Sequence, residues 1–125
     1  MEENTFADSI AVGVPRNGDK ALMAIRESQG LAVNVSDREI MEAQQLLGRS
    51  CGVFGEPAGV TATAGVKKLC EQGILGREET VVSVVTGNGL KDVANAIKAC
   101  GEPISIPGDM NALLRAFSDS GIVVE

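Results

Sequence analysis

The sequence predicts an α/β fold, a small and largely parallel sheet with helices on both faces. Two observations lead to this fold class. Segments rich in β-branched residues alternate with segments of helical periodicity, and the clearest strand, residues 80–86, is apolar without alternation, as in a strand covered on both faces. Three or four strands would leave exposed sheet edges. We therefore interpret residues 1–125 as one domain that is an incomplete piece of a larger sheet structure.

The first half of the chain is predicted to contain two extended segments and two helices. Residues 10–12 form a short apolar run, and residues 31–35 alternate as a half-buried strand does. Residues 18–30 carry apolar and small side chains at helical spacing and end in a glycine. Ser36 and Glu39 have the spacing of a capping box, so a second helix begins there.

The second half is predicted to add the central strand and three more helices. Pro57 suits the first turn of a helix, because a missing backbone N–H costs nothing at that position. The small side chains of residues 58–66 are typical of a helix that is approached closely on several sides. Asp92 and Asp109 are predicted to cap two further helices, each with an apolar face turned inward.

Composition argues against several classes of function. A net charge of −6 and a pI near 4.7 argue against a nucleic-acid partner, which requires clustered Lys and Arg. There is no apolar run long enough to span a bilayer and no basic, then apolar, secretory signal, so we expect a cytoplasmic protein without a membrane partner. The chain has no histidine and its three cysteines lie far apart, so we expect no metal site.

Two loops are candidates for a ligand site. Residues 86–92 follow the central strand, and ligands of open α/β sheets bind at the carboxyl ends of strands. The two glycines there would let the backbone approach a flat ligand closely, although an ordinary turn before a helix capped by Asp92 is the alternative. Glu56 is the second candidate, because the helix dipole stabilises a carboxylate at a helix amino end. A plain N-terminal cap is the alternative for Glu56.

Four segments resemble the threonine synthase family. In chain order they are residues 7–17 (ADSIAVGVPRN), 35–40 (VSDREI), 54–59 (FGEPAG) and 86–92 (TGNGLKD). The resemblance is continuous from Thr5 to Asp92 and fades in the tail. Threonine dehydratases and serine racemases share the Glu-Pro-Ala segment, but they usually carry a Ser-Gly-Gly-Asn loop where this chain has Thr-Gly-Asn-Gly. The loop therefore favours threonine synthase.

The resemblance implies a fold-type-II lyase that uses pyridoxal phosphate to convert O-phosphohomoserine and water into threonine and phosphate. It implies four cofactor-binding residues: Thr86, Gly87, Asn88 and Glu56. The hydroxyl of Thr86 would contact the pyridine nitrogen of the cofactor. It also implies three residues close to the ring or the substrate: Ala7, Asp8 and Ser9.

The chain also departs from the family pattern. The upstream segment with the Schiff-base lysine and the upstream phosphate loop are both absent, so we expect no catalytic residue in this chain and no pyridoxal phosphate held by it alone. Lys91 belongs to the 86–92 loop, and we interpret it as structural. We therefore expect a carboxyl-terminal piece of the large domain that acts with the missing amino-terminal part of the same enzyme, as a homo-oligomer. The alternatives are a free-standing, non-catalytic α/β interaction domain and part of a threonine dehydratase-like enzyme.

Overall fold

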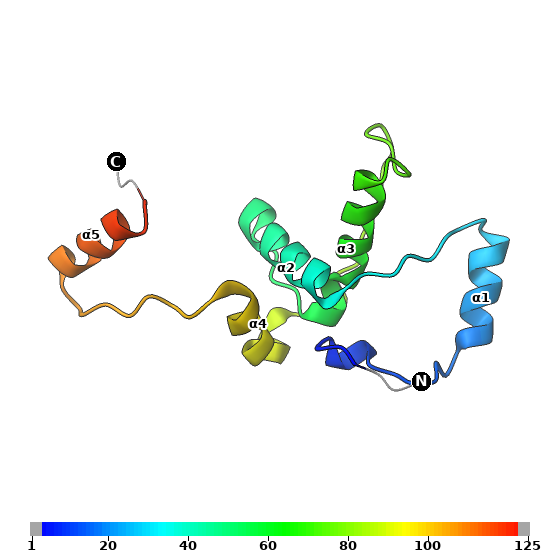
Figure 1. Cartoon of the computed structure of the whole chain (residues 1–125), viewed down its shortest axis with the longest axis horizontal. Helices are drawn as coiled ribbons and strands as arrows, with labels where there is room; N and C mark the ends of the chain where they lie inside the picture. The colour runs from blue at the N-terminus through cyan, green and yellow to red at the C-terminus, as the bar shows by residue number, and fades with distance from the viewer. Residues whose placement is uncertain (1–3, 123–125) are drawn as a thin grey trace.

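The computed structural model describes residues 4–122, and this part of the chain is helical. It contains the α-helices α1 (Gly18–Glu27), α2 (Asp37–Cys51), α3 (Pro57–Glu71), α4 (Val93–Cys100) and α5 (Met110–Asp119), and the 3-10 helices η1 (Asp8–Ile10) and η2 (Gly89–Asp92). Helices α2 and α3 pack together at the centre, whereas α1 and α5 stand apart at opposite ends of the molecule (Figure 1). None of the helices in this range has the length and apolar character that a membrane crossing requires.

The predicted α/β fold with a parallel sheet is wrong. In the described part of the chain the β pairing consists of one isolated antiparallel bridge, between Gly55 and Asn88. The predicted strands at 10–12, 31–35 and 80–86 form no β-strand. Their β-branched residues favour extended backbone, but a sheet also needs a neighbouring strand to pair the N–H and C=O groups. No described segment supplies that neighbour, so 31–35 and 80–86 are extended and unpaired.

Both of these longer segments contact α3 instead. The hydroxyls of Thr63 in α3 and Ser83 share a hydrogen bond of 2.9 Å. The ammonium of Lys68, also in α3, donates to the carbonyl of Asn34 at 2.8 Å. Helix α3 therefore fixes two segments that were predicted to be strands, although the segments do not form a sheet.

The predicted helix starts are confirmed, because each is specified by local hydrogen bonding. Ser36 and Glu39 form the complete capping box of α2. Pro57 lies in the first turn of α3. The side chains of Asp92 and Asp109 accept hydrogen bonds from backbone amides in the first turns of α4 and α5.

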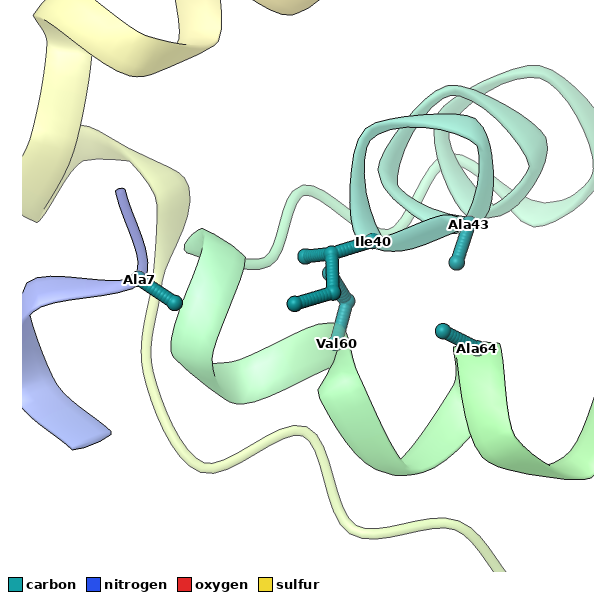
Figure 2. Packing of buried hydrophobic residues seen from close by; sticks show 5 residues of the cluster. All are labelled: Ala7, Ile40, Ala43, Val60 and Ala64. Atoms are coloured by element: carbon teal, nitrogen blue, oxygen red, sulfur yellow. The ribbon is translucent and has the colours of Figure 1, made fainter. Parts of the chain in front are cut away.

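The buried core lies where α2, α3 and η1 meet. Its cluster is small and aliphatic: Ala7, Ile40, Ala43, Val60 and Ala64. Figure 2 shows Ile40 of α2 directed toward Val60 of α3, and Ala43 directed toward Ala64. Because alanine side chains are short, the backbones of the two helices can approach closely at this second pair. The small side chains predicted for a closely packed α3 thus lie at its contact with α2.

Helices α1 and α5 contain no buried residue in the described structure. Leu22 and Met23 of α1 and Met110 and Leu114 of α5 are exposed. The four residues predicted to face inward in the last helix are half-buried, although none is fully buried: Ala112, Leu113, Ala116 and Phe117. These helices leave apolar surface open to a partner.

The Glu39 carboxylate joins α2 to α3 and makes stability depend on pH. A hydrogen bond from the Ser36 backbone, and then the Lys68 ammonium 2.9 Å away, lower the pKa of Glu39 from 4.5 to about 2. A group whose pKa is lower in the folded state stabilises the fold above its unfolded pKa. This contribution is therefore complete above pH 4.5 and is lost as the pH falls toward 2.

We expect the E39Q variant to be less stable than the wild type at neutral pH and to lose less of its thermal midpoint between pH 4.5 and pH 2. Glutamine keeps the hydrogen-bonding shape of the capping box but has no charge to titrate. Thermal unfolding followed by circular dichroism at several pH values measures this difference. E27Q, at an exposed position of α1, is the control. Equal acid sensitivity of E39Q and the wild type would contradict the assignment.

Candidate functional site

The 86–92 loop docks on the segment that leads into α3. The amide of Glu56 donates to the carbonyl of Gly87, and the amide of Gly89 donates to the carbonyl of Phe54, both at 2.9 Å. These two bonds flank the antiparallel bridge described above. The two candidate ligand loops, about thirty residues apart in the sequence, are therefore in direct contact.

Glycine is required where these two segments meet. A Cβ added to Gly87 would lie 1.9 Å from Oε1 of Glu56, and a Cβ added to Gly59 would lie 2.9 Å from the amide nitrogen of Gly87. Neither distance can be accommodated without movement of the loop, of Glu56 or of the start of α3. The close packing of backbone and carboxylate therefore depends on the missing side chains at both positions.

Glu56 is a buried carboxylate at the amino end of α3. It is 5% exposed. The ammonium of Lys91 lies 3.2 Å from its Oε1, and the Lys91 side chain is 61% exposed. Lys91 thus fixes the loop to α3 by an ion pair, in keeping with its interpretation as a structural residue. Glu56 is the N-cap residue of α3, but its side chain makes no capping hydrogen bond to the helix.

Residues 7–9 are held next to this loop by contacts to α2 and α4. The hydroxyl of Thr5 donates to one carboxylate oxygen of Asp37 at 2.5 Å, and the amide of Phe6 donates to the other at 3.2 Å. From α4, the side-chain amide of Asn95 donates to the carbonyl of Phe6 at 3.2 Å. The backbone just before η1 is therefore anchored to both α2 and α4.

A cavity of about 420 Å³ opens between η1, the start of α3 and the start of α4. Its polar lining consists of Asp8, Ser9, Glu56, Lys91, Asp92 and Asn95. Of the seven residues predicted to contact cofactor or substrate, the cavity brings together Asp8, Ser9 and Glu56. Ala7 is buried in the core beside it.

The other three predicted residues lie outside this lining. Thr86 and Asn88 are exposed, and Gly87 packs directly against the carboxylate of Glu56. The side chain of Asn88 accepts a hydrogen bond from the amide of Leu90 at 2.9 Å, which shapes the turn into η2. The structure therefore brings the loop and Glu56 together, but of the loop residues only Lys91 and Asp92 line the cavity, and Thr86, Gly87 and Asn88 do not.

Three polar residues of this region were not predicted from the sequence: Asp37, Gln44 and Asn95. Gln44 is 2% exposed and its side-chain nitrogen donates to the carbonyl of Gly55 at 2.8 Å, which fixes the residue before Glu56. The sequence signal for Gln44 is its position next to the apolar face formed by Ile40 and Ala43. A polar side chain that is buried at such a face normally has a specific hydrogen-bond partner. Asp37 and Asn95 carry no such signal, since both lie in the first turn of a helix, where polar residues are common.

The residues present fit one part of pyridoxal phosphate and not another. The hydroxyl of Thr86 is exposed and makes no hydrogen bond within residues 4–122, so it is available to a ring nitrogen. The cavity, in contrast, is lined by the carboxylates of Asp8, Glu56 and Asp92 with Lys91 as its cation. Three carboxylates against one ammonium leave an excess of negative charge, which disfavours binding of a phosphate group. The described chain therefore offers a contact for the ring but no cradle for the phosphate.

Comparison with known proteins identifies the family. The family model described as pyridoxal-phosphate dependent enzyme matches residues 1–87. The threonine synthase of Methanocaldococcus jannaschii is 50% identical over 115 residues, which cover 92% of this chain and 28% of that protein. The enzyme of Methanosarcina acetivorans is 45% identical over 118 residues, covering 93% and 29%. That of Halalkalibacterium halodurans is 40% identical over 114 residues, covering 90% and 32%.

The chain thus spans less than a third of the length of these curated relatives, while they match nine tenths or more of it. The match includes both loops of the candidate site, and the family model alone covers more than half of the chain. This chain belongs to the family of pyridoxal-phosphate-dependent enzymes and, within it, is a partial homologue of threonine synthase.

Proposed function

We propose that this chain is the carboxyl-terminal part of a cytoplasmic threonine synthase, a lyase that converts O-phosphohomoserine and water into threonine and phosphate in threonine biosynthesis. The observation that carries the proposal is the docking of the 86–92 loop on Glu56, in a chain that is 50% identical to a threonine synthase over 115 residues. The loop has the Thr-Gly-Asn-Gly sequence rather than the Ser-Gly-Gly-Asn sequence of dehydratase-like relatives.

Each site residue has a distinct role in this proposal. Pyridoxal phosphate, when bound, supplies the electron sink for chemistry at the substrate carbon atoms. The hydroxyl of Thr86 binds the pyridine nitrogen with one hydrogen bond and adds no permanent charge. Gly87 and Asn88 keep the adjoining backbone in contact with the cofactor. Glu56 is buried and paired with Lys91, and it holds that backbone in place without contacting the cofactor ring itself.

The segment from Ala7 to Ser9 lies on the substrate side in this proposal. Asp8 and Ser9 line the cavity, where a carboxylate and a hydroxyl can accept and donate hydrogen bonds to a polar substrate. Ala7 is buried in the core and fixes the position of the two polar residues. None of these groups forms a covalent bond to the cofactor, and the chain alone is proposed to be inactive and not to retain pyridoxal phosphate.

The reaction of the full-length enzyme tests this function. An enzyme that contains this chain should release equal amounts of phosphate and threonine from O-phosphohomoserine, with no ammonia. The dehydratase-like alternative would instead release ammonia from threonine. An enzyme that shows the second reaction and not the first would overturn the proposal.

The proposed partners are the amino-terminal part of the same enzyme and further copies of it. This is supported by the unpaired extended segments 31–35 and 80–86 and by the exposed apolar side chains of α1 and α5. Unpaired N–H and C=O groups of extended segments can pair with another strand. Exposed apolar surface costs roughly 25 cal/mol per Å² in water, so its burial favours association.

We expect the isolated chain to form dimers or larger assemblies whose mass rises with concentration. Light scattering coupled to size-exclusion chromatography measures the mass. Replacing both Val82 and Val84, which are exposed in the 80–86 segment, with threonine should weaken the assembly, whereas the same exchange at exposed Val14 is the control. A monomer over a wide range of concentration would contradict this prediction.

A further inference from the structure

The side chain of Asn95 connects the two halves of the candidate site. One contact of its amide nitrogen is to the carboxylate of Asp92, at 2.7 Å, and the other is to the carbonyl of Phe6, at 3.2 Å. Asp92 ends the 86–92 loop, and Phe6 directly precedes the segment from Ala7 to Ser9. One side chain thus joins the 86–92 loop to the segment after Phe6, a residue 89 positions before Asn95 in the sequence.

The geometry of these contacts is specific to asparagine. Its NH₂ group has two hydrogens, one for each acceptor, and its oxygen accepts a hydrogen bond from the Lys98 ammonium at 3.1 Å. The backbone amide of Asn95 is bonded separately to Asp92, as part of the cap of α4. The side-chain contact to Phe6 can therefore be removed while the cap of the helix stays in place.

The position of Asn95 gives this contact a consequence for binding. Asn95 lines the cavity together with Asp8 and Ser9. The carbonyl that accepts from Asn95 also accepts from the amide of Asp8, at 2.9 Å, so the contact lies at the first turn of η1. A mobile η1 would present Asp8 and Ser9 in the correct place for only part of the time, and apparent affinity falls by that fraction.

We propose that Asn95 is a positioning residue, which ties the substrate-side segment 7–9 to the cofactor loop 86–92 through Phe6 and Asp92. The expected effect on substrate binding rests on the proposed function, whereas the hydrogen-bonded link between the two segments does not. Asn95 does not act on the reacting atoms. It sets the position of Asp8 and Ser9, so its loss should weaken substrate binding more than it slows the reaction of bound substrate.

Hydrogen exchange tests whether the contacts of Asn95 with Phe6 and Asp92 hold η1 in place, without any assay of activity. In the full-length enzyme, N95A should speed exchange of the η1 amides of Asp8, Ile10 and Ala11 by about fivefold, the effect of losing one hydrogen bond. The amide of Val60, bonded to Glu56 in α3, should be unaffected. N95D should have a larger effect, because it turns a carboxylate oxygen toward two acceptors.

Asn111, exposed in α5, provides the matched control: N111A should change none of these rates. Unchanged exchange at the η1 amides in N95A would overturn the proposal. Faster exchange at Val60 as well would also overturn it, because Asn95 would then stabilise the whole fold rather than η1.

Steady-state kinetics then test the consequence for the substrate. N95A should raise KM for O-phosphohomoserine, by at most about fivefold, and leave kcat nearly unchanged. A loss of kcat without a change in KM would contradict the positioning role. If the wild-type enzyme does not use O-phosphohomoserine, the proposed function fails, and the exchange measurement still decides whether Asn95 holds η1.

Discussion

The G87A variant of the full-length enzyme is expected to lose most of its activity. The added Cβ would lie 1.9 Å from Oε1 and 2.3 Å from the carboxyl carbon of Glu56, which is impossible without movement. Glu56 cannot move at low cost, because it is 5% exposed and paired with Lys91. Overpacking of this kind costs roughly 1–3 kcal/mol of folding free energy. The 86–92 loop should therefore lift away from α3, together with Thr86.

A second variant and a control make this experiment specific. E56D shortens the carboxylate by one methylene and makes room for the new Cβ, so G87A with E56D should be more stable than the two separate effects predict. In contrast, a Cβ added to Gly48 in α2 meets no atom within 4 Å. G48A should keep full activity and gain up to about 1 kcal/mol, since alanine favours helix over glycine. Thermal midpoint and turnover would be measured for the wild type and for the four variants G87A, E56D, G87A with E56D, and G48A. Wild-type values for G87A would show that the loop does not dock on Glu56.

The helix starts could be predicted because they depend on neighbours in sequence. The Ser36 and Glu39 side chains bond to each other's backbone within one turn, and Asp92 and Asp109 bond amides three residues ahead. Such contacts are present in any fold that contains the segment. The same is not true of a helix face, which explains why α5 is capped as predicted but buries no residue.

The sheet was wrongly predicted because strand pairing is not local. The valines of 31–35 and 80–86 favour extended backbone, and the structure has extended backbone at both places. Whether a strand forms depends on a second strand at hydrogen-bonding distance, and the described chain places α3 beside these segments instead. The residue pattern of each segment therefore does not predict the partner strand on which a sheet depends.

The candidate site shows the same distinction. Glycine spacing and helix position predict the loop and Glu56 as candidates, and the family resemblance implies residues 7–9. The contacts that bring them together, from Gln44 to Gly55 and from Asn95 to Phe6, join residues 11 and 89 positions apart. A single polar residue on a helix does not indicate which carbonyl it will meet in the folded chain.

The stability of the protein should depend little on the side chain of Thr86. It is exposed at the end of the 80–86 segment and makes no hydrogen bond within the described residues. Removal of an unpartnered, exposed hydroxyl should change the free energy of unfolding by less than about 0.5 kcal/mol. A large change in turnover on substitution of Thr86 would therefore report on the cofactor and not on folding.

The T86A variant of the full-length enzyme is expected to lose turnover while it melts like the wild type. A hydroxyl that orients the pyridine nitrogen acts in every step at the ring, where about 1.4 kcal/mol of lost transition-state stabilisation lowers the rate tenfold. T86S keeps the hydroxyl and should keep most activity. The carboxylate of T86D should favour the protonated form of the ring nitrogen and so change the balance between productive and side reactions. T80A, at the exposed start of the same extended segment, is the matched control and should leave turnover unchanged. Turnover on O-phosphohomoserine and thermal midpoint decide the outcome: if T86A turns over as fast as T80A, Thr86 does not contact the ring.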